Sequence, residues 1–206
     1  MGAVERRARQ REEVRSQIVD AARDIVVNEG YHALTMRRIA EAVEYSPAAI
    51  YQYFQNRDAI AVAVTSEGFV QLLHAFAPSR SLDNPRARLE AIARAYVDFG
   101  LTNPQTYRLM FMEDPEITRA LLAQPDRNDP GTQAYLAIVE PIALLAQQGA
   151  IDARDDASVR AIADTLWVTV HGIVSLKLTC PTFPETPVDV LIASAMRTFF
   201  EGILKR

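Results

Sequence analysis

The sequence is poor in cysteine and glycine, and each shortage excludes a class of site. With one cysteine, Cys180, among 206 residues, the chain can form neither a disulfide framework nor a cysteine-rich metal site. Its eight glycines are spread so far apart that no Gly-rich phosphate loop of the Walker or Rossmann type can form. No motif for a nucleotide is present, and we expect no cofactor.

Long uncharged stretches are also lacking. The longest uncharged runs have 12 residues, whereas a membrane-spanning helix needs roughly 18 or more apolar residues. The N-terminal sequence MGAVERRARQREEVR contains no apolar stretch that could act as a signal peptide. The sequence therefore predicts a soluble, cytoplasmic protein with no membrane partner.

The charge is slightly acidic, with 22 basic and 26 acidic side chains and a net charge of −4. This balance excludes a protein that coats nucleic acid or an anionic membrane by bulk charge. The charge is also unevenly placed: residues 1–60 hold nine basic and nine acidic side chains and are neutral. The whole of the −4 therefore lies after residue 60.

Prolines mark the expected helix starts, because proline suits the first helical position and the preceding polar residue can cap it. Six such pairs occur: Ser46-Pro47, Asn84-Pro85, Asn103-Pro104, Asp114-Pro115, Asp129-Pro130 and Thr186-Pro187. Helical apolar spacing covers about 5–29, 59–77, 86–101, 132–148, 157–179 and 188–204, with a kink or break expected at Pro141. Strand alternation and hairpin turns are missing, so the fold class predicted is all-α.

A short helix pair is predicted near the N-terminus. Thr35 can cap one helix that runs to Val43, and Ser46-Pro47 starts a second that runs to about Tyr53. Two short helices joined by a three-residue turn form the helix-turn-helix pattern, whose second helix enters the DNA major groove. We place a three-helix DNA-binding domain at 1–56 and a larger C-terminal helical domain at 57–206.

The surface left on this pair favours DNA contact over a purely structural role. With the apolar side chains inward, arginines and tyrosines remain near one outer side: Arg37, Arg38, Tyr51, Tyr53 and Arg57. Two other classes stay open on spacing alone. These are an all-α small-molecule-binding protein and a protein-interaction module, in each of which the helix pair only packs.

The segment from Thr35 to Asp58 resembles the DNA-binding signature of the TetR/AcrR family of transcriptional regulators. The matching residues are Thr35, Ile39-Ala40, Ser46, the run Ile50-Tyr51-Gln52-Tyr53-Phe54, and Arg57. The resemblance implies a regulator without enzymatic activity that binds a double-stranded DNA operator. The resemblance and the expected base readout by the helix pair together give ten candidate DNA-contact residues. They are Thr35, Arg37, Ser46, Pro47, Ala48, Ala49, Tyr51, Gln52, Tyr53 and Arg57.

Two positions depart from the family pattern. Glu44 stands in the turn where the family usually has glycine, and a positive φ there would be unfavourable for it. The second helix begins Pro47-Ala48-Ala49, which offers no side-chain donor for base readout. Readout would then depend on Arg37, Gln52, Ser46 and contacts between the alanines and thymine methyl groups.

The C-terminal half carries a weaker resemblance. Trp167 and His171-Gly172 are similar to the WHG-type C-terminal domain of some members of the family. Such a domain binds an effector between helices, although core packing is the better explanation for each aromatic residue taken singly. The candidate ligand-binding residues are Tyr96, Phe99, Tyr107, Met110, Phe111, Trp167, Val170 and His171.

The last two helices have apolar residues around most of their circumference, which indicates that they are buried on several sides. We expect them to form a four-helix dimer interface, as in this family, through Ile162, Leu166, Ile173, Leu191, Ile192, Ala195, Phe199 and Ile203. The expected molecule is a homodimeric repressor that an unidentified small-molecule effector releases from DNA. Metal binding is not expected, because the three histidines are far apart and no metal-ligand spacing occurs.

Overall fold

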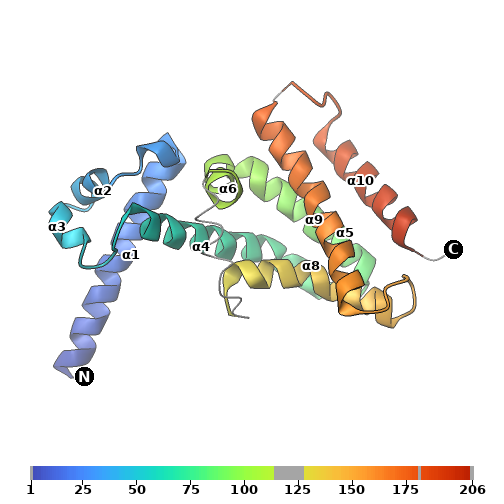
Figure 1. Ribbon diagram of the computed structural model, residues 1–206, viewed down its shortest axis with the longest axis horizontal. Helices are drawn as coiled ribbons and strands as arrows, with labels where there is room; N and C mark the ends of the chain where they lie inside the picture. The colour runs from blue at the N-terminus through green and yellow to red at the C-terminus, as the bar shows by residue number, and fades with distance from the viewer. Residues whose placement is uncertain (1, 114–127, 181, 205–206) are drawn as a thin grey trace. The chain divides into compact units, whose positions relative to one another are not determined.

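The computed structural model describes residues 2–113, 128–180 and 182–204, and in these residues the chain is all-α, as predicted (Figure 1). Within the described residues, the single β-type pairing is an isolated antiparallel bridge between Ile151 and Leu204. The helices are α1 (Ala3–Glu29), η1 (Tyr31–Ala33), α2 (Met36–Ala42), α3 (Pro47–Ile50), α4 (Arg57–Phe76), η2 (Ala77–Ser81), α5 (Pro85–Thr102), α6 (Pro104–Phe111), α8 (Pro130–Gln147), α9 (Asp156–Thr179) and α10 (Val188–Ile203).

The chain folds into two compact units. The first contains the chain up to Phe69 together with α6 from Gln105, and the second contains residues 70–104 and the chain from α8 onward. The division therefore runs through α4, whereas the sequence suggested a boundary after residue 56. The helix α6, which the sequence assigned to the C-terminal domain, packs with the first unit.

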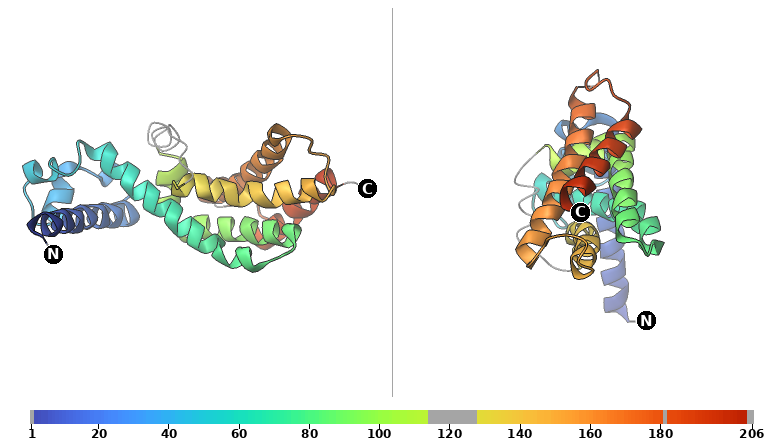
Figure 2. Two further views of the ribbon diagram at one scale, coloured as in Figure 1. Left: turned by 90° about the horizontal axis from the view of Figure 1, so that it is seen from below. Right: turned by 90° about the vertical axis from the view of Figure 1, so that its right-hand side faces the viewer.

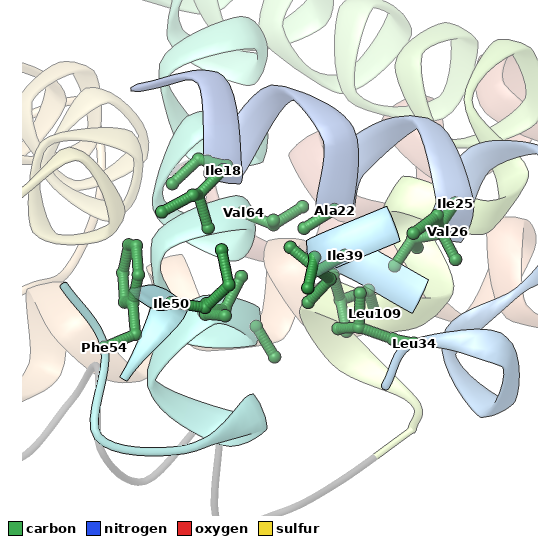
Figure 3. Packing of buried hydrophobic residues seen from close by; sticks show 14 of the residues in the cluster. Ile18, Ala22, Ile25, Val26, Leu34, Ile39, Ile50, Phe54, Val64 and Leu109 are labelled. Atoms are coloured by element: carbon green, nitrogen blue, oxygen red, sulfur yellow. The ribbon is translucent and has the colours of Figure 1, made fainter. Parts of the chain in front are cut away.

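The first unit is built around one apolar core. Side chains from α1, α2, α3 and α4 meet there, and Figure 3 shows Ile18, Ile39, Ile50 and Val64 pointing toward one another. Leu109 of α6 completes this core and is 1% exposed. A core shared by five helices fixes the short helices α2 and α3, which are too short to be stable alone.

Four predicted N-caps explain where α2, α3, α5 and α8 begin. Thr35, Ser46, Asn84 and Asp129 each accept a hydrogen bond from a backbone N–H in the first turn of α2, α3, α5 and α8. The prediction for Thr186-Pro187 was wrong by one residue. Pro187 itself precedes α10 and no side chain caps that helix. The pair Asp114-Pro115 lies outside the described residues.

Two helices differ in extent from the prediction. A kink or break was predicted at Pro141. Pro141 lies buried inside α8, which continues from Pro130 to Gln147, so the helix is not broken there. Packing of α8 against both α5 and α9 offsets the cost of about 3 kcal/mol that proline imposes on a helix interior. The helix α3 ends at Ile50 and not at about Tyr53, and Gln52 and Tyr53 follow it in tighter turns bonded to Ala49 and Ile50.

The second unit is a helical bundle. The helices α5, α8 and α9 pack on one another, and α10 packs on α9 and α5 (Figure 2). Ion pairs add to the apolar contacts. At the surface, Arg94 of α5 lies 2.7 Å from Asp189 of α10, and the half-buried Arg88 of α5 lies 3.3 Å from the exposed Glu140 of α8. Such pairs add little stability when exposed, so burial of the apolar faces holds the bundle together.

Two helical segments, Arg57–Ser81 and Asp156–Thr179, are long and apolar enough to cross a membrane by length and composition alone. This is weak support for a membrane span, because the core helices of soluble proteins meet the same criterion. The apolar window of the second segment is only 22% buried within the chain. The helix α9 therefore presents apolar surface that its own chain does not cover.

Candidate DNA-binding and effector sites

The helix pair has the local geometry that its sequence predicts. The Thr35 hydroxyl accepts a hydrogen bond from the Arg38 N–H at 3.2 Å, and the Ser46 hydroxyl accepts one from the Ala49 N–H at 3.2 Å. Ile39 and Ala40 of α2 and Ile50 of α3 are fully buried. The caps and these buried residues fix the start and the inward face of each short helix, which leaves the polar side chains outward.

The proposed DNA-contact residues are accessible. They occupy α2 and its cap, α3 and its cap, the turn after α3, and the first position of α4. Seven are exposed and three are partly exposed, the latter being Ala49, Tyr53 and Arg57. Tyr51 is more than half exposed. The structure thus brings all ten residues onto one contiguous segment of the first unit.

The arginines of this segment differ in how they are held. Arg37 is the most exposed, and its Nε donates to Glu41 Oε1 at 2.8 Å, one turn along α2. This hydrogen bond raises the pKa of the Arg37 guanidinium. Arg38 instead forms a two-point pair with Glu29 at the end of α1, which raises the pKa of Arg38 and lowers that of Glu29. Arg38 therefore links α1 to α2.

Arg57 is held at the start of α4. Its guanidinium lies over the Tyr31 ring at 4.7 Å and pairs with the neighbouring Asp58 carboxylate at 2.8 Å. The Tyr31 hydroxyl donates to the same carboxylate at 3.2 Å. These contacts limit the rotamers of Arg57 while leaving part of the side chain accessible.

Glu44 has the strained backbone expected for it, with φ of 58°. It is the C′ residue of a Schellman motif that ends α2: the Tyr45 N–H donates to the Ala40 carbonyl at 2.9 Å, and the Glu44 N–H donates to the Glu41 carbonyl. Glycine is the usual residue at C′ because it carries no Cβ penalty in the left-handed region. The turn geometry is thus kept although the residue that favours it is absent.

Two arginines of α1 contact the turn after α3, and the sequence analysis did not identify them. Arg11 Nη2 donates to the Gln52 carbonyl at 3.1 Å, and its guanidinium lies 5.9 Å from the centre of the Tyr53 ring. Arg15 lies over the Phe54 ring at 4.2 Å. Their i, i+4 spacing places them on one face of α1. This spacing is the feature of the sequence from which a shared contact surface could have been predicted.

In the second unit, three of the candidate effector residues form a polar cluster. Trp167 Nε1 donates to the Tyr96 hydroxyl at 3.1 Å, and that hydroxyl lies 3.2 Å from His171 Nδ1. Burial lowers the pKa of His171 and so favours its neutral ring. The cluster joins α5 to α9, and Phe99 and Val170, which lie near it in the sequence of these helices, are buried.

A fourth aromatic residue extends this cluster. The ring of Tyr135 in α8 lies 6.0 Å from that of Trp167, and its hydroxyl donates to Asp164 at 2.7 Å. Burial and this hydrogen bond raise the pKa of Tyr135 to about 12. Tyr135 was not among the sequence candidates. Its spacing in a helical apolar pattern gave no sign that it would meet α9.

The remaining candidates lie elsewhere. Tyr107, Met110 and Phe111 belong to α6 in the first unit, where Tyr107 and Met110 are fully buried and the Tyr107 and Phe111 rings are 4.9 Å apart. The eight residues are therefore divided between two units. Tyr96, Trp167 and His171 of the second unit form the hydrogen-bonded cluster described above.

The predicted dimer residues differ in exposure. Leu166, Ile192 and Phe199 are buried within their own unit. The other five, which are Ile162, Ile173, Leu191, Ala195 and Ile203, are half-buried. The large exposed apolar side chains of these helices are Val168 and Leu176 of α9 and Val190 of α10. When a helix has apolar residues around its whole circumference, their spacing in the sequence does not indicate which side faces the core.

In residues 2–113, 128–180 and 182–204, no group of three or more histidine, cysteine, aspartate or glutamate side chains could hold a metal ion.

Comparison with known proteins agrees with this architecture. Residues 18–64 match the family described as "Bacterial regulatory proteins, tetR family", and residues 89–199 match "Tetracyclin repressor-like, C-terminal domain". A curated relative, the HTH-type transcriptional activator FasR of Mycolicibacterium smegmatis, is 33% identical over 105 residues. That match covers 50% of this chain and 48% of FasR. The uncharacterised regulator YobS of Bacillus subtilis is 26% identical over 96 residues, which cover 47% of this chain and 50% of YobS.

Solved structures share the fold over most of the chain. A protein of unknown function from Rhodococcus sp. RHA1 superposes with a TM-score of 0.73 at 24% identity, covering 93% of this chain and 95% of that one. The fatty acid degradation regulator FadR from Bacillus halodurans gives 0.70 at 15% identity, covering 90% of this chain and 94% of FadR. These likenesses show the fold, and the family matches identify it. The chain belongs to the TetR family of transcriptional regulators, which are DNA-binding proteins and not enzymes.

Proposed function

We propose that this protein is a homodimeric, cytoplasmic repressor that a small-molecule effector releases from its operator. The observation that carries the proposal is the exposed α2–α3 segment, which presents Arg37, Tyr51 and Gln52 on a rigid first unit. Residues of these types suit phosphate and base-edge contacts. In this proposal Arg37 reaches a guanine edge, Tyr51, Tyr53 and Arg57 hold phosphates, and Ala48 and Ala49 contact thymine methyl groups.

The effector site proposed is the cluster of Tyr96, Trp167 and His171. Its hydroxyl and ring nitrogens lie among buried apolar side chains, an arrangement that fits a small, mainly apolar molecule with one polar group. An effector shifts the regulator only if it binds the DNA-bound and released conformations with different affinities, and such coupling is typically about 1–3 kcal/mol. Tyr96→Phe should weaken effector binding without weakening operator binding.

The dimer proposed forms through the outer faces of α9 and α10. The exposed Val168, Leu176 and Val190 support it, because large apolar side chains at the surface of two neighbouring helices favour a partner that covers them. A two-fold dimer would present its two recognition helices to successive major grooves about 34–36 Å apart. The operator would then be a pseudo-palindrome.

Activation is the second candidate, and one observation favours it. FasR is named a transcriptional activator, and it is 33% identical to this chain over the matched half. The DNA contacts would be the same in either case, and only the position of the operator relative to the promoter would differ. Deleting the gene and measuring transcripts next to the selected operator separates the two: transcripts rise for a repressor and fall for an activator.

The direct test is operator selection from the organism's own upstream DNA, followed by binding measurements on variants. Arg37→Ala and Tyr51→Ala should each lower operator affinity at least tenfold. Arg154→Ala is the matched control, because the Arg154 side chain is 86% exposed and pairs with Asp152, while that of Arg37 is 83% exposed and pairs with Glu41. Parent-like operator binding by both test variants would refute the proposed DNA interface.

A further inference from the structure

Residues 4–13, in the first turns of α1, place no side chain in the core of the first unit. Val14 is the first buried residue of the helix, and residues 4–13 are exposed throughout. In Figure 1 the N-terminal turns of α1 extend past α2 and α3. A helical segment that buries no side chain gains little from tertiary packing.

Arginines of this segment are ordered along one face. Arg15, Arg11 and Arg7 follow one another at i, i+4 spacing, and the first two already contact the segment after α3. Arg15 lies over Phe54, and Arg11, one turn further out, bonds to the Gln52 carbonyl and lies near Tyr53. The same face therefore continues outward to Arg7, about 6 Å beyond Arg11 along the helix axis.

Negative charge is kept away from this face. At about 100° per residue, Glu5, Glu12 and Glu13 lie at least about 100° around the helix from both Arg7 and Arg11. Arg9 lies about 160° from each of them, on the opposite side. Arg7 forms none of the ion pairs or hydrogen bonds of the described residues, whereas Arg11 is engaged with the turn.

We propose that Arg7 is a phosphate-binding residue that extends the DNA interface from the turn after α3 onto the first turns of α1. This inference rests on the proposed DNA interface, because Gln52 and Tyr53 fix which face of α1 adjoins the DNA. Arginine suits the task, since its always-charged guanidinium can bond a phosphate at two points. The contact is independent of base sequence and adds affinity to operator and non-operator DNA alike.

The test measures binding of the full-length protein to its selected operator and to a random duplex of about 30 base pairs over a range of salt concentrations. Arg7→Gln should weaken binding to both duplexes by a similar factor. It should also reduce the slope of log affinity against log salt by about 0.9 for each protomer bound. Arg7→Lys, which keeps the charge, should restore most of that slope.

Arg9→Gln is the matched control, with the same charge change on the opposite face of the same helix. It should bind with the parent slope. A parent slope for Arg7→Gln overturns the inference, as does an equal loss for Arg9→Gln, which would indicate bulk charge. A loss confined to the operator would indicate base readout and also overturn it. If Arg37→Ala and Tyr51→Ala abolish specific binding while Arg7→Gln changes nothing, only this inference fails and the proposed function stands.

Discussion

At the residue scale, Glu44 shows how a fold can keep a turn whose preferred residue has been replaced. Its φ of 58° is held by the two hydrogen bonds of the Schellman motif, from the Tyr45 and Glu44 N–H groups. The burial of Ile39 on one side of the turn and Ile50 on the other leaves the chain little choice of path. A left-handed conformation costs a residue with a Cβ roughly 1–2 kcal/mol.

Glu44→Gly should therefore stabilise the protein, by about 0.5–1 kcal/mol after the greater entropy of glycine in the unfolded chain is subtracted. The midpoint of denaturant unfolding measures this gain. Glu44→Gln is the control, because it keeps the backbone cost and removes the charge, and its stability should match the parent. If Glu44→Gly is no more stable than Glu44→Gln, the strain account is wrong. Both variants should bind DNA more tightly if the carboxylate repels phosphate.

His171 predicts a pH dependence of stability. Burial lowers its pKa in the folded state, so between the folded and unfolded pKa values the unfolded chain binds more protons. Stability from this residue is present above the unfolded pKa of about 6.5 and is lost as the pH falls below it. Thermal unfolding should show the midpoint falling more steeply in the parent than in His171→Gln as the pH falls below about 6.5. The same pH dependence in His171→Gln as in the parent would contradict this account.

At the scale of elements, α6 belongs to the first unit because of one close contact. A Cβ on Gly68 of α4 would lie 2.7 Å from Met110 Sδ and 3.0 Å from Thr106 Cγ2, both on α6. Glycine at this position lets α6 approach α4, and Leu109 then enters the core of the first unit. The chain thus leaves the first unit along α4 and returns to it along α6.

Gly68→Val should destabilise the protein by about 1–3 kcal/mol, because Met110 is fully buried and cannot move aside freely. Gly202→Val is the control: it also lies in a helix, and no atom lies within 4 Å of its added Cβ. Its free energy of unfolding should change by less than about 1 kcal/mol. Equal effects of the two substitutions in chemical denaturation would show that α6 is not held at Gly68.

The elements also show where sequence patterns succeed. The caps Thr35, Ser46, Asn84 and Asp129 were predictable because an N-cap depends only on residues within one turn of it. The continuity of α8 through Pro141 was not predictable, because it depends on packing against α5 and α9. The early end of α3 has a similar origin, since Phe54 must turn inward to reach the core and Arg15.

At the scale of the whole molecule, the outer face of α9 is the feature that its own chain leaves incomplete. Val168 is 69% exposed and Leu176 is 42% exposed, on a helix whose apolar window is mostly uncovered. Covering such a face with a second copy of the chain removes apolar area from water at about 25 cal/mol per Å². This is the physical basis for the proposed dimer.

Val168→Asp should convert the protein to a monomer at micromolar concentration, measured by size-exclusion chromatography with light scattering, because the dimer would have to bury a carboxylate. Val27→Asp is the matched control, at a valine of α1 that is 47% exposed in the first unit. It should remain dimeric. A monomeric parent protein, or a dimeric Val168→Asp, would refute the proposed interface.

The sequence by itself determined the all-α class, the helix-turn-helix segment and the family, because each depends on local spacing, capping and a short motif. The tertiary structure decided which apolar side chains fill the core and which face outward. It buried Leu166, Ile192 and Phe199, placed α6 in the first unit, and brought Arg11 against the turn after α3. These outcomes depend on contacts between residues far apart in the chain. The spacing of apolar residues along a helix shows that a face is buried, but not which neighbouring helix buries it.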